Sequence, residues 1–343
     1  METDSPSAPT GFIVGVDIGG SKVAAGLVVP TGEIHYRTRI PMLANDGPAA
    51  GLATITQAID QVCAKAAGSG ACDRSLRGIG ICCPGPLDPH NGVVINPPNL
   101  PCWCNFPLAD EVSRKYKVPV KVDNDANAAA LAEALWGAGR GYRNIFLTIL
   151  GTGIGTGIVF DGRIYHGRTG AAGEGGHVSI DYRGPICGCG KAGCIEAFAS
   201  GPAIAKRARA KLSANGTRES VLHRLAEGQC GSVTPEMVGE AYAQGDPAAA
   251  ETLRETVKLL SIWLGNMIDL LEPDVIIVGG GVGILMKPFL GEIRDLLPAC
   301  CVNRRCQEIP LLPAFYGGDA GIAGGAALAA EVLSDNALEP ETA

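Results

Sequence analysis

Three thiols and one imidazole lie close together in the second half of the chain, at separations of ten, two and five residues. They are His177, Cys187, Cys189 and Cys194. One histidine and three cysteines make a Cys₃His set, which fills all four positions of a structural zinc site. Glycines separate the thiols, as a tight knuckle requires. The alternative is chance clustering among thirteen cysteines, but ligand types and glycine spacing together favour zinc.

Two carboxylates, Glu174 and Glu196, flank this set. A metal bound there would fix the loop that carries them, so that they could accept hydrogen bonds from the hydroxyls of a substrate. His177 can serve twice, with one ring nitrogen on zinc and the other N–H offered to that substrate.

Three glycine-rich turns each follow an apolar strand, at 17–22, 150–155 and 278–282. None has the Gly-x₄-Gly-Lys-Ser/Thr or the complete dinucleotide-binding pattern, and any one alone reads as an ordinary hairpin. Three such turns favour nucleotide phosphates bound by backbone N–H groups. Asp17, at the first turn, is either a Mg²⁺ ligand or a turn cap.

Asp125 stands between a predicted strand at 118–122 and an alanine-rich helix at 126–136. Local sequence favours a helix N-cap. The same strand end also carries Asp123, Asn124 and Asn127, which is more polar groups than a cap needs. Ligands bind at the carboxyl edge of α/β sheets, where a carboxylate can take the proton of a hydroxyl that attacks a phosphoryl group.

The chain has 343 residues and a net charge of −7, with 28 basic and 35 acidic side chains. The length suggests two domains, and the charge argues against nucleic acid or an anionic membrane as a partner. The start shows no export signal, and the longest apolar helical stretch, 259–271, is too short to span a bilayer. We therefore expect a cytoplasmic protein with reduced thiols.

Strands and helices alternate along the chain, which indicates an α/β protein. Strands are predicted at 12–18, 23–29, 34–40, 79–83, 118–122, 144–150, 158–160, 164–165 and 275–278. Helices are predicted at 47–67, 126–136, 248–271 and 319–333. The stretches after the first two glycine turns match as strand–turn–strand units, which indicates an internal duplication and two related sheets.

These residues resemble the ROK family of sugar kinases (repressor, open reading frame, kinase), and most of all its bacterial-type glucokinases. The resemblance runs from Phe12 to about Leu333. It rests on the motifs at 17–22, 84–86, 99–103, 124–127 and 150–155 and, most specifically, on Gly-Glu-Gly-Gly-His at 173–177 together with Cys-Gly-Cys-Gly-x-x-Gly-Cys-x-Glu at 187–196.

The resemblance implies a role for each matching residue. Asp125 would be the general base for the 6-hydroxyl of the sugar. Sugar contacts would be Asn99, Asn124, Glu174, His177 and Glu196. The ATP-binding loops would contain Asp17, Gly19, Gly20, Ser21, Lys22, Thr152, Gly153 and Gly280. The cofactors would be ATP with catalytic Mg²⁺ and a structural Zn²⁺, and the protein would form a homodimer.

The implied fold is the two-lobed actin/hexokinase-like (ribonuclease H-like) ATPase fold with a zinc knuckle at 177–194. We expect a disordered tail at 1–11, a small α/β domain at 12–125, a large α/β domain at 126–318 and a tail at 334–343. The helix at 319–333 would pack back on the small domain.

The leading hypothesis is phosphoryl transfer from ATP to O6 of glucose. The alternatives are another hexose (N-acetylglucosamine, N-acetylmannosamine, mannose or fructose) and a non-catalytic, sugar-sensing regulator, which the negative charge disfavours. Cys82, Cys83 and Cys102 replace the small residues usual in the family near the expected sugar loops, and they put the shape of the pocket in question.

Overall fold

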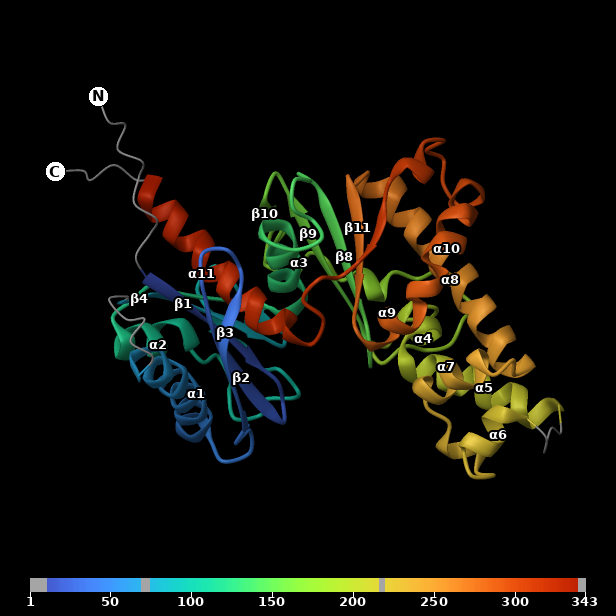
Figure 1. Ribbon diagram of the computed structural model, residues 1–343, viewed down its shortest axis with the longest axis horizontal. Helices are drawn as coiled ribbons and strands as arrows, with labels where there is room; N and C mark the ends of the chain where they lie inside the picture. Colours follow the sequence, from blue (N-terminus) through green and yellow to red (C-terminus); the bar gives the residue numbers. More distant parts are fainter. Residues whose placement is uncertain (1–10, 69–74, 216–219, 339–343) are drawn as a thin grey trace. The chain divides into compact units, whose positions relative to one another are not determined.

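The computed structural model describes residues 11–68, 75–215 and 220–338 (Figure 1). The chain forms two compact units. Unit 1 consists of Met1–Gly141, Val159–Ala172 and Tyr316–Ala343. Unit 2 consists of Tyr142–Ile158 and Gly173–Phe315.

Unit 1 is built on a five-stranded sheet in the order β3-β2-β1-β4-β7. Its strands are β1 (Gly11–Ile18), β2 (Lys22–Val28), β3 (Ile34–Pro41), β4 (Ser75–Cys83) and β7 (Val120–Asn124). The first three pair antiparallel, whereas β4 runs parallel to both β1 and β7. A short hairpin of β5 (Leu87–Asp88) and β6 (Val93–Val94) follows β4.

Helices cover both faces of this sheet (Figure 1). On one face, α1 (Pro48–Gly68) and α2 (Leu108–Tyr116) share a core with alternate residues of β1, such as Val14 and Val16. On the other face, α3 (Asp125–Leu135) and α11 (Ala320–Leu338) pack against Ile13 of the same strand, which points away from Val14. Because side chains alternate along a strand, one apolar strand supplies both cores.

Helix α11 lies unusually close to the sheet. A Cβ on Gly15 of β1 would stand 1.8 Å from the carbonyl oxygen of Ile322, and one on Gly80 of β4 1.7 Å from that of Gly325. Only glycine therefore fits at these two strand positions. The close approach holds the helix against β1 and β4, the strands that lead toward Asp17 and Cys82.

The second sheet has the order β10-β9-β8-β11-β12. Its strands are β8 (Ile145–Leu150), β9 (Ile154–Phe160), β10 (Arg163–Ile164), β11 (Val275–Gly279) and β12 (Leu311–Pro313). Strand for strand this repeats the order of the first sheet, including two parallel pairs at its second half. The repetition supports the predicted duplication.

Unit 2 carries most of the helices that follow the cysteine loop. They are α4 (Glu196–Ala199), α5 (Gly201–Asn215), α6 (Val221–Leu225), α7 (Pro235–Ala243), α8 (Pro247–Leu271), α9 (Gly281–Met286) and α10 (Leu290–Leu296). Helix α8 begins where the Asp246 side chain accepts a hydrogen bond from Ala249 N, with proline at its first position. Its Trp263 is fully buried against Phe146 of β8.

The observed units differ from the predicted domains in three places. Helix α3, placed after the boundary at residue 125, belongs to unit 1, because its alanine-rich surface packs on α11. Residues 159–172 also belong to unit 1. Gly11, predicted as part of a tail, belongs to β1, and α11 continues through Leu338, beyond the predicted end of that helix. Residues 1–10 and 339–343 lie outside the described part.

Candidate functional site

The polar residues of unit 1 gather at one edge of its sheet. Since β1, β4 and β7 are parallel, their carboxyl ends meet there. The register places Asp17 opposite Cys82, and Cys82 opposite Asp123. Neighbouring strands are about 4.8 Å apart, so Asp17 and Asp123 lie on either side of Cys82, one residue on each strand.

The junction of β7 and α3 presents Asp125 to solvent. Asn124 occupies the N-cap position, and its side-chain oxygen accepts a hydrogen bond from Ala126 N at 2.9 Å. Asp125 Oδ1 accepts from the same N–H at 2.8 Å. The cap that local sequence assigned to Asp125 is therefore at Asn124, and Asp125 Oδ1 shares the same N–H donor.

The first glycine turn joins β1 to β2 and is closed by Gly19 N donating to Lys22 O at 2.8 Å. A Cβ on Gly20 would stand 2.8 Å from Asn99 O, so the loop with Asn99 lies directly against this turn. Desolvation raises the pKa of Asp17 above its usual value, although Lys22 and Arg39 lower it. Such a carboxylate gains from a nearby cation more than an exposed one does.

The two glycine turns of unit 2 lie side by side. Gly280 has a φ of +84°, and a Cβ there would stand 2.2 Å from Leu150 O. Gly151 O in turn accepts a hydrogen bond from Gly201 N at the start of α5, at 2.8 Å. Thr152, Gly153 and Gly280 are thereby brought together, beside the N-terminus of a helix, where anions bind.

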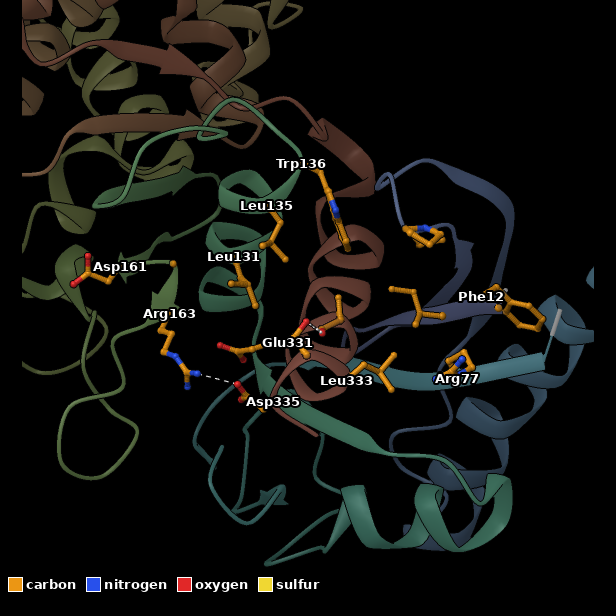
Figure 2. A pocket seen from close by; sticks show the side chains of 17 residues that line it. Phe12, Arg77, Leu131, Leu135, Trp136, Asp161, Arg163, Glu331, Leu333 and Asp335 are labelled. Atoms are coloured by element: carbon orange, nitrogen blue, oxygen red, sulfur yellow. Dashed lines mark hydrogen bonds and ion pairs between the residues drawn. The ribbon is translucent and has the colours of Figure 1, made fainter. Parts of the chain in front are cut away.

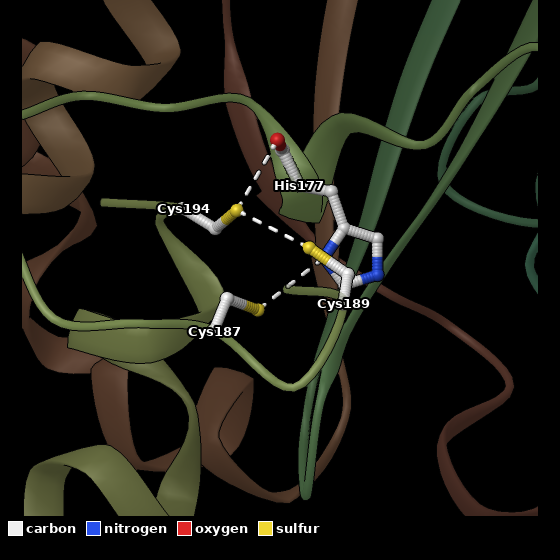
Figure 3. Close-up of side chains that lie close together, drawn as sticks. All are labelled: His177, Cys187, Cys189 and Cys194. Carbon is white, nitrogen blue, oxygen red and sulfur yellow. Dashed lines mark hydrogen bonds between the residues drawn. The ribbon is translucent and has the colours of Figure 1, made fainter. Parts of the chain in front are cut away.

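The predicted metal ligands converge in unit 2 (Figure 3). One ligand atom from each of the four residues lies within 4.8 Å of the others. Cys187 Sγ and His177 Nδ1 are 3.6 Å apart, as are the sulfurs of Cys189 and Cys194. Two thiolates on one tetrahedral zinc stand about 3.8 Å apart, and a thiolate and an imidazole nitrogen about 3.5 Å. The donor set therefore fits zinc in both chemistry and spacing.

Backbone hydrogen bonds shape the loop around these ligands. Cys187 N donates to Lys191 O and Gly190 N to Cys187 O, at 2.8 and 2.9 Å, which closes the knuckle between the thiols. The Lys191 ammonium reaches back to His177 O at 2.8 Å. The loop is thus tied to the histidine by its main chain as well as by any metal.

Thr156 and Trp263 form hydrogen bonds with the backbone next to Glu174. The Thr156 hydroxyl donates to Gly173 O and accepts from Gly175 N, and the Trp263 indole donates to Gly175 O at 3.0 Å. Thr156 and Trp263 are both buried. These bonds fix the backbone on each side of Glu174, whose side chain is exposed.

Glu196 connects the metal cluster to a glycine turn. Its Oε2 accepts a hydrogen bond from Ile154 N at 2.9 Å, and its Oε1 lies 3.5 Å from Cys187 Sγ and 4.0 Å from His177 Nδ1. A Cβ on Gly153 would stand 2.6 Å from Oε2. Only glycine lets the carboxylate lie so close to this turn.

Cys82, Cys83 and Cys102, the departures from the family pattern, are all buried. Desolvation raises the pKa of each thiol, and Asp17 and Asp125 raise that of Cys82 further. These thiols stay protonated at neutral pH and act as small apolar side chains.

A cavity of about 700 Å³ opens in unit 1 between α11, the end of α3 and β10 (Figure 2). Its wall includes Leu131 and Trp136, and an ion pair of 2.8 Å joins Arg163 to Asp335 at its rim. None of the predicted sugar, nucleotide or metal residues lines it. Its wall takes in the carboxyl end of α3, whereas Asp125 begins that helix, so we assign the cavity to none of those ligands.

Sequence reasoning missed three residues that support the site: His166, Thr156 and Trp263. His166 hydrogen-bonds to Asp123, 43 residues away. Thr156 lies 17 residues from the carbonyl that it binds, and Trp263 lies 88. Partners so far apart in the sequence form no local pattern, so the sequence could not predict these hydrogen bonds.

Comparison with known proteins settles the family. The model of the ROK family matches residues 13–332. The chain belongs to the ROK family. This ROK protein has the family's α/β fold, of the actin/hexokinase-like type.

The relatives of this ROK protein include curated glucokinases. Those of Streptomyces coelicolor and Halalkalibacterium halodurans are 33% and 35% identical to it, over 94% and 96% of this chain and 98% and 97% of theirs. A crystal structure of a ROK family glucokinase from Streptomyces griseus with glucose and AMPPNP is 34% identical, with a TM-score of 0.74 over 94% of this chain and all of that one.

Other relatives are named for different roles. An N-acetylmannosamine kinase of Escherichia fergusonii is 30% identical over 92% of this ROK chain and 97% of its own. A xylose repressor of Caldicellulosiruptor bescii is 28% identical over 84% of this chain and 70% of its own. Among the described residues, no helix is both long and apolar enough to span a membrane.

Proposed function

We propose that this ROK protein is an ATP- and Mg²⁺-dependent hexokinase that transfers phosphate to O6 of glucose. The observation that carries the proposal is the exposed Asp125 carboxylate at the carboxyl edge of the sheet, on a chain that full-length glucokinases match. Asp17 in unit 1 and the glycine turns of unit 2 supply the features expected of a nucleotide site.

Asp125 acts as the general base in this proposal. It takes the proton from the sugar 6-hydroxyl as O6 forms its bond to the γ-phosphorus and ADP leaves. Asn124 is the N-cap of α3, and Asp125 stands exposed at the first position of that helix. Asn99, Asn124, Glu174, His177 and Glu196 hold the sugar by hydrogen bonds.

Asp17 is the residue that would hold Mg²⁺, directly or through water. The metal would supply positive charge for the phosphate oxygens. The desolvation that raises the pKa of Asp17 fits a carboxylate whose natural counter-charge is a cation. Gly19, Gly20, Ser21, Lys22, Thr152, Gly153 and Gly280 would surround the nucleotide with backbone N–H groups and hydroxyls.

Zinc, in this proposal, is structural. His177, Cys187, Cys189 and Cys194 would hold it, with no position left for substrate. Its role is to fix the loop between Glu174 and Glu196, because both carboxylates flank its ligands.

Glucose is the first choice of hexose because curated glucokinases match nearly the whole chain. N-acetylmannosamine is the second candidate, favoured by the relative with that activity. A non-catalytic sugar-sensing regulator is the third; the xylose repressor extends well beyond the part that this chain matches.

The test is ADP release with ATP, Mg²⁺ and a panel of glucose, mannose, fructose, N-acetylglucosamine and N-acetylmannosamine. We expect the highest kcat/KM with glucose. Asp125→Asn should lower kcat by about 100- to 10,000-fold, because it removes the base. The asparagine keeps an oxygen to accept from Ala126 N, so the start of α3 is retained.

The matched control is Asp295→Asn, which neutralises an exposed carboxylate on α10. It should retain wild-type rates. If no hexose stimulated ADP release above background, the kinase proposal would be wrong. If Asp125→Asn kept the wild-type kcat, Asp125 would not be the base.

A further inference from the structure

The Asp123 carboxylate, two residues before the proposed base, is completely buried. A buried carboxylate is stable only when hydrogen bonds or a cation compensate the loss of water. Asp123 Oδ1 accepts from Asn124 N at 2.6 Å and from Asn127 Nδ2 at 3.1 Å. Both donors belong to the same junction of β7 and α3. One oxygen of Asp123 therefore ties together the turn that presents Asp125.

The other oxygen of Asp123 is held from a distant part of the chain. Asp123 Oδ2 and His166 Nε2 are 2.5 Å apart. When the carboxylate is ionised it can only accept, and His166 Nε2 is then the donor of this bond. Among the described residues, His166 is the one long-range partner of the carboxylate.

His166 is itself kept in place by unit 1. It follows β10 and exposes 15% of its side chain. Its carbonyl oxygen accepts from Ala172 N at 3.2 Å, and its ring lies edge-on to that of His90, with centroids 5.4 Å apart. A ring so confined can orient the carboxylate that it binds.

We propose that His166 is a positioning residue for phosphoryl transfer: by holding Asp123 Oδ2, it fixes the Asn124–Asp125 turn and so the direction in which the base points. The inference rests on the proposed function, since it needs Asp125 to be that base. It gives the reaction a further residue, one that acts through Asp123.

The test compares His166→Leu with His166→Gln. Leucine removes the N–H donor, whereas the glutamine amide can still donate to Asp123. We expect leucine to lower kcat by about 10- to 100-fold, as a small misplacement of a reacting group does. The KM for ATP should stay within about twofold of the wild-type value, and glutamine should restore kcat to within about threefold.

The control is His35→Leu, which replaces an exposed histidine of β3 that makes no bond to Asp123 or His166. It should keep the wild-type kcat. Hydrogen–deuterium exchange of the peptide 118–130 supplies a readout that does not depend on activity. Its Asn124 and Ala126 amides should exchange faster in His166→Leu and at the wild-type rate in His166→Gln.

A wild-type kcat and wild-type exchange in His166→Leu would overturn the positioning role. Equal loss of kcat in the leucine and glutamine variants would also overturn it, because the donor would then not matter. Wild-type protein without hexose-dependent ADP release would overturn the kinase proposal, and with it the catalytic meaning of His166. The exchange measurement would distinguish failure of the kinase proposal from failure of the positioning role, because it follows the Asn124–Asp125 turn and does not depend on activity.

Discussion

The β7–α3 junction of unit 1 and the cysteine loop of unit 2 are both loops that present carboxylates, but they are held by different means. Around Asp123, protein donors satisfy both carboxylate oxygens. In the cysteine loop, four ligand atoms face one another at the spacing of a zinc site. In one loop protein donors satisfy the carboxylate, and in the other the side chains form a donor set that fits zinc.

The difference shows how a carboxylate is fixed for each task. A base must keep one geometry throughout the reaction, and hydrogen bonds from a folded sheet edge provide that. The long loop between Glu174 and Glu196 has little regular structure, so a metal is an economical means of fixing it. The two loops should therefore respond differently to metal removal and to the loss of single hydrogen bonds.

Among the changes that test this comparison of the two loops, the largest effect is expected from Cys194→Ser. Loss of this ligand should remove zinc and raise the KM for glucose by at least about tenfold, since Glu174 and Glu196 lose their support. Elemental analysis measures the zinc content, and steady-state kinetics measure the KM for glucose. Exchange in the peptide 173–196 should rise, while that in 118–130 should not change.

Cys230→Ser, outside the cluster, is the control for this variant. Equal acceleration of exchange in both loops would contradict the comparison, because it would mean that zinc supports the whole chain. Full zinc content in Cys194→Ser would remove Cys194 from the ligand set.

The second effect concerns the hydrogen bonds between the Thr156 hydroxyl and the backbone on each side of Glu174. Thr156→Val leaves the buried Gly175 N–H and the Gly173 carbonyl without their partner, which should lower the free energy of unfolding by about 1–3 kcal/mol. Thr156→Ser keeps the hydroxyl and should lie nearer the wild type. Chemical denaturation of the zinc-loaded protein measures the change. No loss in Thr156→Val would show that the Thr156 hydroxyl does not help to hold this segment.

The smallest effect on stability is predicted for Asp17→Asn in unit 1. Desolvation raises the folded-state pKa of Asp17, so ionising it on raising the pH costs stability. The asparagine variant should melt about 1–3 °C higher than the wild type at pH 8, and the difference should vanish as the pH falls below the pKa of Asp17. The asparagine variant should also release less ADP than the wild type, because Asp17 is the proposed Mg²⁺ ligand. A lower melting temperature at pH 8 would show that Lys22 and Arg39 outweigh desolvation.

The sequence predicted most strands within a few residues because each is an apolar run ended by glycine or a polar turn, as at β1 and β8. It also predicted that His177, Cys187, Cys189 and Cys194 would gather at one place, because they are close in sequence. It did not predict that Asn124 would cap α3, because two neighbouring polar residues suit the position equally. It could not find His166 or Trp263, whose partners are distant. The boundary placed after residue 125 differs from the observed units because packing of α3 on α11 has no local pattern.

The hydrogen bond from Trp263 to Gly175 gives the chain a built-in spectroscopic reporter. The chain has three tryptophans: Trp263 is buried in unit 2, Trp103 is buried in unit 1, and Trp136 lines the cavity of unit 1. Fluorine-labelled indoles would give three resonances, one for each environment. Chelation should move that of Trp263 and leave that of Trp103 in place, so a single spectrum would follow the two units separately.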